Sequence, residues 1–323
     1  MKRNSRFLVI LSAFVAVLIG GLAIVAFAMF VIGTPWLAAL NPYYALADWS
    51  NEDTTVTEIT ATIDDRGREA SLLSAFFGVD GGLPPLLRIF FCPFAPGKDG
   101  MPVVFSHELD IGSVQAGDFR VVSQAGSVGT VACTTFLPAA DKGELRTVLL
   151  GGEFGSAADQ PLSVEIVGNV LSMDGSVNFK GAQVSVVPLE DGPSIALART
   201  VPEAQWRVGE RATSLPWGGG SGCPVGTRLA VRVTWEGGVT NPDGSDADDE
   251  DRKRYGVVFS EAGDRSERVP TALADLGDGD NNHLLCFDVE GDPREVRFPA
   301  GFLTDPRDDL NPDTAAPVAR GPG

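Results

Sequence analysis

The residues of this sequence best suited to chemistry are carboxylates and amides gathered in a few loops. The stretch DLGDGDNNHLLCFD, Asp275 to Asp288, sets acids and amides beside one of only two histidines in the chain. Ca²⁺ takes about six to eight oxygen ligands from such groups, from carbonyls and from water. We therefore predict a calcium site here, with ligands Asp275, Asp278, Asp280 and Asn282. A solvated turn is the alternative, because Asp, Asn and Gly dominate turns and the loop lacks the ligand spacing of an EF-hand.

A second acidic loop, NPDGSDADDED at 241–251, offers a less developed set of calcium ligands, Asp243, Asp246 and Asp248. Three cations, Arg252, Lys253 and Arg254, follow it directly. They provide the alternative interpretation, in which the segment neutralises its own acids. The stretch DPRDDLNPD at 305–313 is a third loop of the same composition.

Nucleophilic catalysis requires a base within hydrogen-bonding reach of the nucleophile. Ser106, His107 and Glu108 are consecutive, and consecutive side chains of a strand point to opposite faces. We therefore expect His107 to be a strand-edge residue without a catalytic bond to Ser106. Gly-x-Ser-x-Gly is absent, since GGSGC around Ser221 fails at its last position, and neither His-Glu-x-x-His nor a phosphate-binding Gly-x4-Gly-Lys occurs. The sequence predicts no enzyme and no catalytic residue, with an exported hydrolase as the least favoured alternative.

An apolar run near the amino terminus indicates the cellular compartment. After Lys2, Arg3 and Arg6 of a short cytoplasmic segment (1–6), residues 7–32 carry no charge and are apolar apart from Ser12. This run exceeds the roughly 20 residues that cross a bilayer. We predict a transmembrane anchor at 7–32, a stalk at 33–51 and an extracytoplasmic remainder, because positive charges stay on the cytoplasmic side. The small residues of Ala26-Phe27-Ala28 leave a cleaved signal and secretion as the alternative.

Charge and cysteines bear on partners and redox state. The formal charge of −18 argues against nucleic acid, whose phosphates require a basic surface, and leaves a cell-surface protein or glycan as the expected partner. The four cysteines include no Cys-x-x-Cys pair, so two disulfides are expected outside the cytoplasm. Three pairings are possible. We favour Cys92 with Cys133 and Cys223 with Cys286, because each pair closes within one of the two blocks described next.

Period-two alternation of apolar and polar residues dominates the rest of the chain. It is clear in PLSVEIVG (161–168), LAVRVTW (229–235) and YGVVF (255–259), and it predicts half-buried strands. One short helix is expected in REASLLSAFFG (68–78). Short strands bounded by Gly, Pro, Asp and Asn indicate an all-β sandwich, and we divide the chain into blocks 52–200 and 201–316 with a flexible tail at 317–323.

The stretch GMPVVFSHELDIGSVQAGDFRVVSQAGSVGT, Gly100 to Thr130, resembles the opening of bacterial Ig-like domains of the SbsA type. The positions that carry the resemblance are Phe105, Ser106, Asp110, Ser113 and Phe119. Residues 160–181 resemble a late strand of such domains, and 296–314 repeat the pattern more loosely. The resemblance implies one or two Ig-like antiparallel β-sandwiches and no catalytic residue.

These observations together predict a non-catalytic, membrane-anchored extracytoplasmic β-sandwich protein with a structural, adhesion or partner-binding role. The alternative is a module that binds calcium or a carbohydrate. In that case an aromatic side chain, Trp217 or Trp235, would assist the acidic loops.

Overall fold

The computed structural model describes residues 47–48, 50–83, 99–211, 219–261 and 264–321. All belong to the second of two compact units, Leu46–Gly323. Among the described residues, no helix has both the length and the apolar character needed to cross a membrane. The predicted cytoplasmic segment, the predicted anchor and most of the predicted stalk lie outside these residues.

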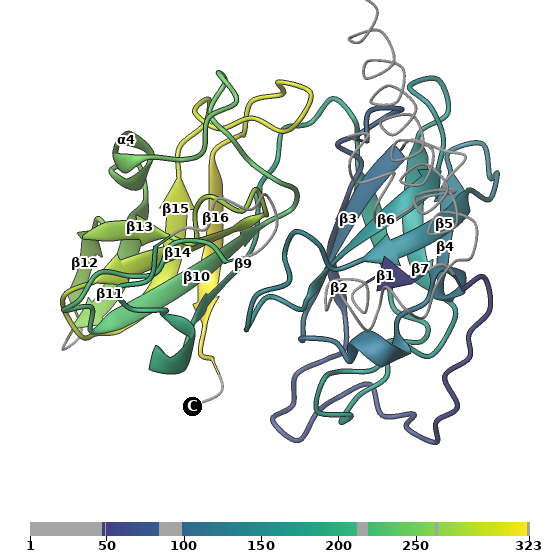
Figure 1. Cartoon of the computed structure of the whole chain (residues 1–323), viewed down its shortest axis with the longest axis horizontal. Helices are drawn as coiled ribbons and strands as arrows, with labels where there is room; N and C mark the ends of the chain where they lie inside the picture. Colours follow the sequence, from purple (N-terminus) through teal and green to yellow (C-terminus); the bar gives the residue numbers. More distant parts are fainter. Residues whose placement is uncertain (1–46, 49, 84–98, 212–218, 262–263, 322–323) are drawn as a thin grey trace, which may run out of the picture. The chain divides into compact units, whose positions relative to one another are not determined.

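The described part of the chain is all-β and forms two curled sheets of eight strands each (Figure 1). In spatial order the first contains β1 (Ala47–Asp48), β5 (Thr130–Thr135), β6 (Thr147–Glu153), β3 (Asp99–Phe105), β2 (Leu72–Phe76), β8 (Gln183–Val187), β7 (Pro161–Ile166) and β4 (Phe119–Ser123). Neighbouring strands are antiparallel, except that β2 runs parallel to β8. The strand β2, which follows β1 in the chain, is thus paired with β8, the last strand of this sheet.

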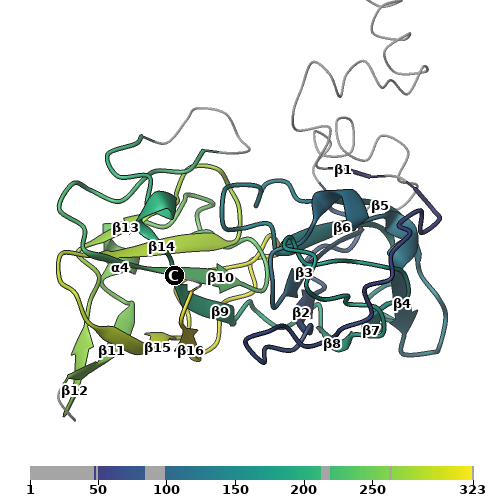
Figure 2. The same cartoon turned by 90° about the horizontal axis from the view of Figure 1, so that it is seen from below.

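The second sheet repeats this plan. In spatial order it contains β12 (Asp264–Arg268), β11 (Gly256–Glu261), β15 (Asp292–Phe298), β16 (Thr314–Ala319), β9 (Ile195–Thr200), β10 (Leu229–Trp235), β14 (Asn282–Phe287) and β13 (Ala272–Ala274). Again only the first and last strands, β9 and β16, are parallel. Figure 2 shows β10, β13 and β14 in one layer and β11, β15 and β16 in another. The described α-helix, α4 (Asp249–Arg252), has a single turn.

Each sheet encloses its own apolar core, which explains the alternation in the sequence. In the first, Phe105 packs edge-to-face on Phe119 and Phe179. In the second, Trp235 and Tyr255 both pack against Phe298. Aromatic pairs of this kind add about 0.5–1.5 kcal/mol each beyond the burial of their area.

The strand β10 differs from the half-buried strand that its alternation predicts. Val231, Val233 and Trp235 enter the core as expected, but Arg232 on the opposite face is also buried. That face is covered because it contacts the first sheet, as described below. A polar residue on a strand therefore did not mark a solvent-exposed face here.

The segment predicted as a helix, 68–78, forms the strand β2 instead. Ala75 and Phe77 are in the first core, and Ser74 and Phe76 are buried as well. A strand buried on both faces has a continuous apolar run, which periodicity alone cannot distinguish from a short helix.

Two boundaries also differ from those expected from the sequence. The strand β9, placed at the end of the first block, pairs with β10 and β16, so the second sheet begins at Ile195 rather than after residue 200. The expected tail, 317–323, overlaps β16, which pairs with β15 and β9. Its Ala, Pro and Val residues are too small to give a strong apolar signal. The Gly321 amide still donates to Thr200 Oγ1 at 3.0 Å.

The structure confirms the predicted disulfide between Cys223 and Cys286, with Cα atoms 5.8 Å apart. It ties β14 to the loop that precedes β10. Cys133 is also disulfide-bonded, and no described cysteine is free. Cys92, its predicted partner, lies outside the described residues.

Candidate functional site

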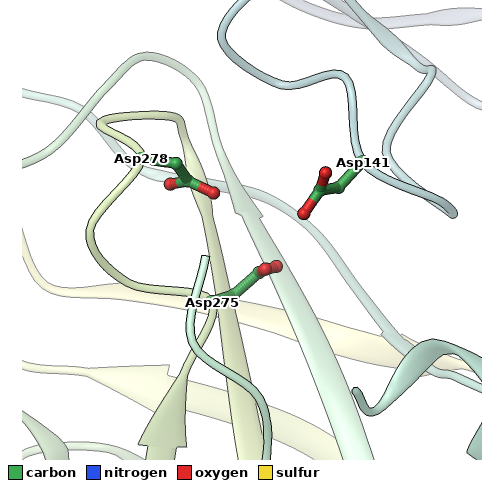
Figure 3. A group of neighbouring side chains, drawn as sticks. All are labelled: Asp141, Asp275 and Asp278. Carbon is green, nitrogen blue, oxygen red and sulfur yellow. The ribbon is translucent and has the colours of Figure 1, made fainter. Parts of the chain in front are cut away.

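Three carboxylates from both sheets converge at one point. Asp141 lies in the loop between β5 and β6, and Asp275 and Asp278 lie in the loop between β13 and β14. One oxygen from each carboxylate is within 4.8 Å of the other two, and Figure 3 shows the three side chains directed toward one another. We call Asp141, Asp275 and Asp278 the acidic cluster.

Backbone contacts fix the loop that carries two of these residues. Asp275 has φ 67, a left-handed conformation that Asp tolerates better than most residues. Its amide donates to Ser221 O at 2.7 Å, and the Gly220 amide donates to Asp278 Oδ2 at 3.0 Å. A Cβ at position 220 would lie 2.7 Å from that oxygen. The Gly-rich segment at 219–222 therefore approaches closely because it has no side chain at Gly220.

A buried arginine lies behind the acidic cluster. Arg232 of β10 places Nη2 3.1 Å from Glu144 Oε1 and Nε 3.6 Å from Asp275 Oδ2, and all three side chains are 1% exposed. Arg207 forms a second ion pair across the sheets, with Asp141. These contacts join the loop at 136–146 of the first sheet to the second sheet.

The carboxylates around Arg232 are nonetheless in excess. Burial, then the charge of Asp275, raises the pKa of Asp278 to about 6. Burial also raises the pKa of Glu144 and of Asp280 well above the ordinary value. For Arg232 burial alone would lower the pKa, but the charges of Glu144 and Asp275 raise it. The site therefore favours protonation of its carboxylates or the binding of a cation, because either adds positive charge.

The spacing of the acidic cluster suits a hard divalent cation. Ca²⁺ lies about 2.3–2.6 Å from its oxygen ligands, so ligands on opposite sides of the ion are roughly 5 Å apart. The three oxygens of the acidic cluster fall within this limit. Asp275 Oδ2 is buried and accepts no hydrogen bond, and it forms an ion pair with Arg232 at 3.6 Å.

The structure brings together two of the four residues predicted as ligands in the first loop. Asp275 and Asp278 are in the acidic cluster, whereas Asp280 and Asn282 bond to each other. Asp280 Oδ1 accepts from the Asn282 amide at 2.7 Å, and Oδ2 accepts from Asn282 Nδ2 at 2.8 Å. Sequence reasoning missed Asp141, which is far away in the chain and stands in a loop with no ligand-like spacing.

The weaker set of predicted ligands is engaged in local hydrogen bonds. Asp243 Oδ1 accepts from the Ser245 amide at 2.9 Å, and Asp248 caps α4 by accepting from the Glu250 amide at 2.7 Å. Asp246 Oδ2 accepts from the Gly277 amide at 2.6 Å, which ties this loop to the first. Its acids therefore organise the turn and support the neighbouring loop.

The cations that follow this loop behave as the alternative interpretation proposed. Lys253 Nζ lies 3.1 Å from Asp249 and 2.6 Å from Glu250. Arg252 also pairs with Asp249. Positive and negative charges of the segment therefore pair on the surface of α4.

His107 is not the strand-edge residue that was expected. It is buried, with Nδ1 2.9 Å from Ser106 Oγ and Nε2 3.3 Å from Asp64 Oδ2. The expectation failed because both residues lie beyond the end of β3, in a bend where side chains no longer alternate. Ser106 Oγ is also 2.9 Å from Glu69 O and 3.0 Å from the Ser71 amide, so the backbone already holds this hydroxyl.

The second histidine and the aromatic residue proposed for sugar binding lie in the second core. His283 Nδ1 is 2.7 Å from Tyr255 OH, which accepts from Trp235 Nε1 at 3.0 Å. Burial lowers the pKa of His283 to about 4. Trp235 has no exposed surface, so it cannot contact a sugar as the sequence suggested. Trp217 lies outside the described residues.

Comparison with known proteins shows only a distant structural likeness. No family model matches the sequence, and no curated protein matches it. Among solved structures, the fold is similar to the N-terminal part of the bacterial S-layer protein SbsC, with a TM-score of 0.27 and 8% sequence identity. The alignment covers 79% of this chain and 45% of that chain, so it spans less than half the length of the SbsC structure.

Proposed function

We propose that this chain is a non-catalytic, membrane-anchored extracytoplasmic protein, built from two tandem Ig-like sandwiches, with a structural, adhesion or partner-binding role. The strand order is the observation that carries the proposal. An Ig-like sandwich has strands A, B, E and D in one layer and C, F and G in the other. The order β5-β6-β3-β2 and β8-β7-β4 corresponds to D-E-B-A and G-F-C.

The second sheet supports the same interpretation independently. There β13-β14-β10-β9 corresponds to D-E-B-A, β16-β15-β11 corresponds to G-F-C, and β12 is an additional strand beside C. In both sheets the A and G strands are parallel neighbours. Agreement between two separate stretches of chain favours a duplicated module over a chance arrangement.

The extracytoplasmic location is supported by the cysteines and the first 32 residues. The buried Cys223–Cys286 disulfide is typical of oxidising compartments. The apolar run at 7–32, preceded by three cations, favours an anchor with its amino terminus inside the cell. The acidic remainder then faces the exterior.

One buried and one partly exposed ion pair between the sheets support a structural role. Arg232 with Glu144, and Arg207 with Asp141, connect residues of the two sheets. A contact of this kind restricts motion between the modules more than an exposed linker would. A spacer or adhesion protein requires such restriction, because it must hold a binding surface away from the membrane.

Protease treatment of intact cells expressing the full chain tests the location. We expect external protease to degrade the chain while a cytoplasmic control protein survives, and we expect unreduced protein to have no thiol that alkylates. A chain that is protected in intact cells and has four reactive thiols would refute the proposal.

Calcium binding at the acidic cluster is a second candidate function. It is favoured by the convergence of Asp141, Asp275 and Asp278, whose carboxylates each place an oxygen within 4.8 Å of the other two. Saturation at 100 times Kd would stabilise the folded protein by about 2.7 kcal/mol, which corresponds to roughly 5–11 °C in melting temperature.

The test compares melting with and without Ca²⁺ in the parent protein and two variants. Asp278→Asn should abolish the rise, and Asp243→Asn, at an exposed turn away from the acidic cluster, should retain it. Mg²⁺ serves as the comparison ion, since it demands a smaller octahedral site. An unchanged melting curve in excess Ca²⁺ would eliminate this candidate.

A further inference from the structure

A polar cavity separate from the acidic cluster contains two buried arginines that form no ion pair with a carboxylate of the described residues. Its volume is ≈ 310 Å³, near the lower limit of about 300 Å³ for small-molecule pockets. Arg146, which precedes β6, and Arg199, in β9, line it together with His107 and Glu108. The cavity shares no lining residue with the acidic cluster.

The two arginines have hydrogen-bond donors for which the described part of the chain provides no acceptor. Arg146 is 2% exposed and Arg199 is 7% exposed. Arg146 Nε, and both Nε and Nη2 of Arg199, are buried without a hydrogen-bond partner. Arg146 Nη1 donates to Ser106 O at 3.1 Å. Buried polar groups are nearly always hydrogen-bonded, so several unsatisfied guanidinium donors in one cavity indicate a missing acceptor.

Arg232 provides an internal comparison within the same protein. It is equally buried, but it has two carboxylates, Glu144 and Asp275, within 4 Å. Among the described residues, neither Arg146 nor Arg199 has a carboxylate at ion-pair distance. Burial, and then the charge of Arg199, lowers the pKa of Arg146 to about 9, the opposite direction from Arg232.

The charge around the cavity indicates the class of ligand. Arg68 is already paired with Asp64, and Asp65, Arg66 and Asp174 are exposed at the rim, where water and salt screen them. The buried part has two guanidinium groups against one half-buried carboxylate, Glu108. A ligand with one negative charge would make the buried part of the cavity neutral, whereas a dianion would give it a net negative charge.

Guanidinium groups bind planar carboxylates through paired N–H donors. The carboxylates of Glu108 in the buried part and of Asp174 at the rim can accept hydrogen bonds from ligand hydroxyls. We propose that this cavity binds the carboxylate of a small sugar acid, of the uronic acid type, through Arg146 and Arg199. Its size admits one monosaccharide unit, which can be the free acid or one residue of a glycan.

Calorimetric titration of the purified full chain in mild detergent tests the proposal. The probes are glucuronate, its methyl glycoside and glucose, which has the same ring without a carboxylate. We expect glucuronate or its glycoside to bind and glucose not to bind. Binding of the methyl glycoside assigns the site to a glycan-linked residue, and binding of glucuronate alone assigns it to the free acid.

Substitution at Arg199 adds a readout that a merely structural role would not produce. Arg199→Gln should raise Kd for glucuronate at least tenfold, because truncating one partner of a buried charge pair costs more than a factor of ten. It should also raise the melting temperature without ligand, because it removes an unpaired buried charge. Arg294→Gln, at a half-exposed surface arginine, is the matched control and should change neither quantity.

Arg199→Lys provides a second test in case the Arg199→Gln variant does not fold. It keeps the charge but loses the paired donors, so binding should weaken while folding is retained. Equal binding of glucose and glucuronate overturns the proposal. So does equal stabilisation by chloride or acetate, or an Arg199→Gln variant that binds glucuronate as tightly as the parent. Failure of this test leaves the proposed Ig-like surface protein and the acidic cluster unaffected.

Discussion

Replacing Arg232 by Met should destabilise the protein by about 3–5 kcal/mol, because it leaves buried carboxylates without their cation. Arg232 is 1% exposed, and it lies 3.1 Å from Glu144 and 3.6 Å from Asp275. Methionine preserves much of the apolar stem, so lost packing contributes little. At roughly 2–4 °C per kcal/mol, the melting temperature should fall by about 6–20 °C.

The assay is thermal unfolding followed by circular dichroism at pH 7. Arg294→Met is the control, because Arg294 is half-exposed and pairs with Asp292 at the surface, where an ion pair contributes about 0–1 kcal/mol. The double variant Arg232→Met/Glu144→Gln should recover part of the loss, since it removes a stranded charge. Lowering the pH should also reduce the difference in melting temperature between Arg232→Met and the parent protein, because protonation neutralises the carboxylates that have lost their cation. Equal melting of Arg232→Met and Arg294→Met would refute this account of the contact between the sheets.

Three further predictions concern other parts of the structure. Cys223 and Cys286 are 63 residues apart, so replacing both by Ser should cost about 4 kcal/mol in the chain-entropy description, and unchanged urea unfolding would contradict this. Burial lowers the pKa of His283 to about 4, below its unfolded value near 6.5, so stability present above pH 6.5 should decline by about 3 kcal/mol as the pH falls to 4. If a His283→Gln variant loses the same amount of stability as the pH falls, other groups are responsible for the decline. Ser106→Ala should destabilise the protein by about 1–3 kcal/mol, because the Ser71 amide loses its acceptor. Serine-directed fluorophosphonates should not label Ser106. Labelling of Ser106 would instead indicate that it is a nucleophile.

The strands that were predictable are those with one face in a core and the other partly exposed. In β7, Val164 and Ile166 are buried and the intervening Glu165 is half-buried, so alternation located the strand. Leu162, which has the same parity as Val164, is nevertheless exposed. The strand β2 was missed because both of its faces are buried, and β16 was missed because its residues are small. The alternation of apolar and polar residues therefore identifies a strand only where one face is buried and the other is more exposed.

The candidate sites were less predictable, because they combine residues from distant parts of the chain. Asp275 and Asp278 were found from local composition, but Asp141 and Arg232 join them only through contact between the two sheets. The arginine cavity has the same origin, since Arg146 and Arg199 belong to different sheets. A single sequence gives the chemical type of these residues but not which of them meet.

The parallel pairing of first and last strands has a mechanical consequence. The module from β2 to β8 and the module from β9 to β16 each begin and end with strands that are parallel neighbours, β2 with β8 and β9 with β16. Tension applied to the two ends of a module then slides these strands past each other, which loads their hydrogen bonds simultaneously. In an antiparallel pair with both ends on one side, the bonds would open one at a time. We therefore expect single-molecule stretching of the chain to give sharp, separate unfolding events for the two modules.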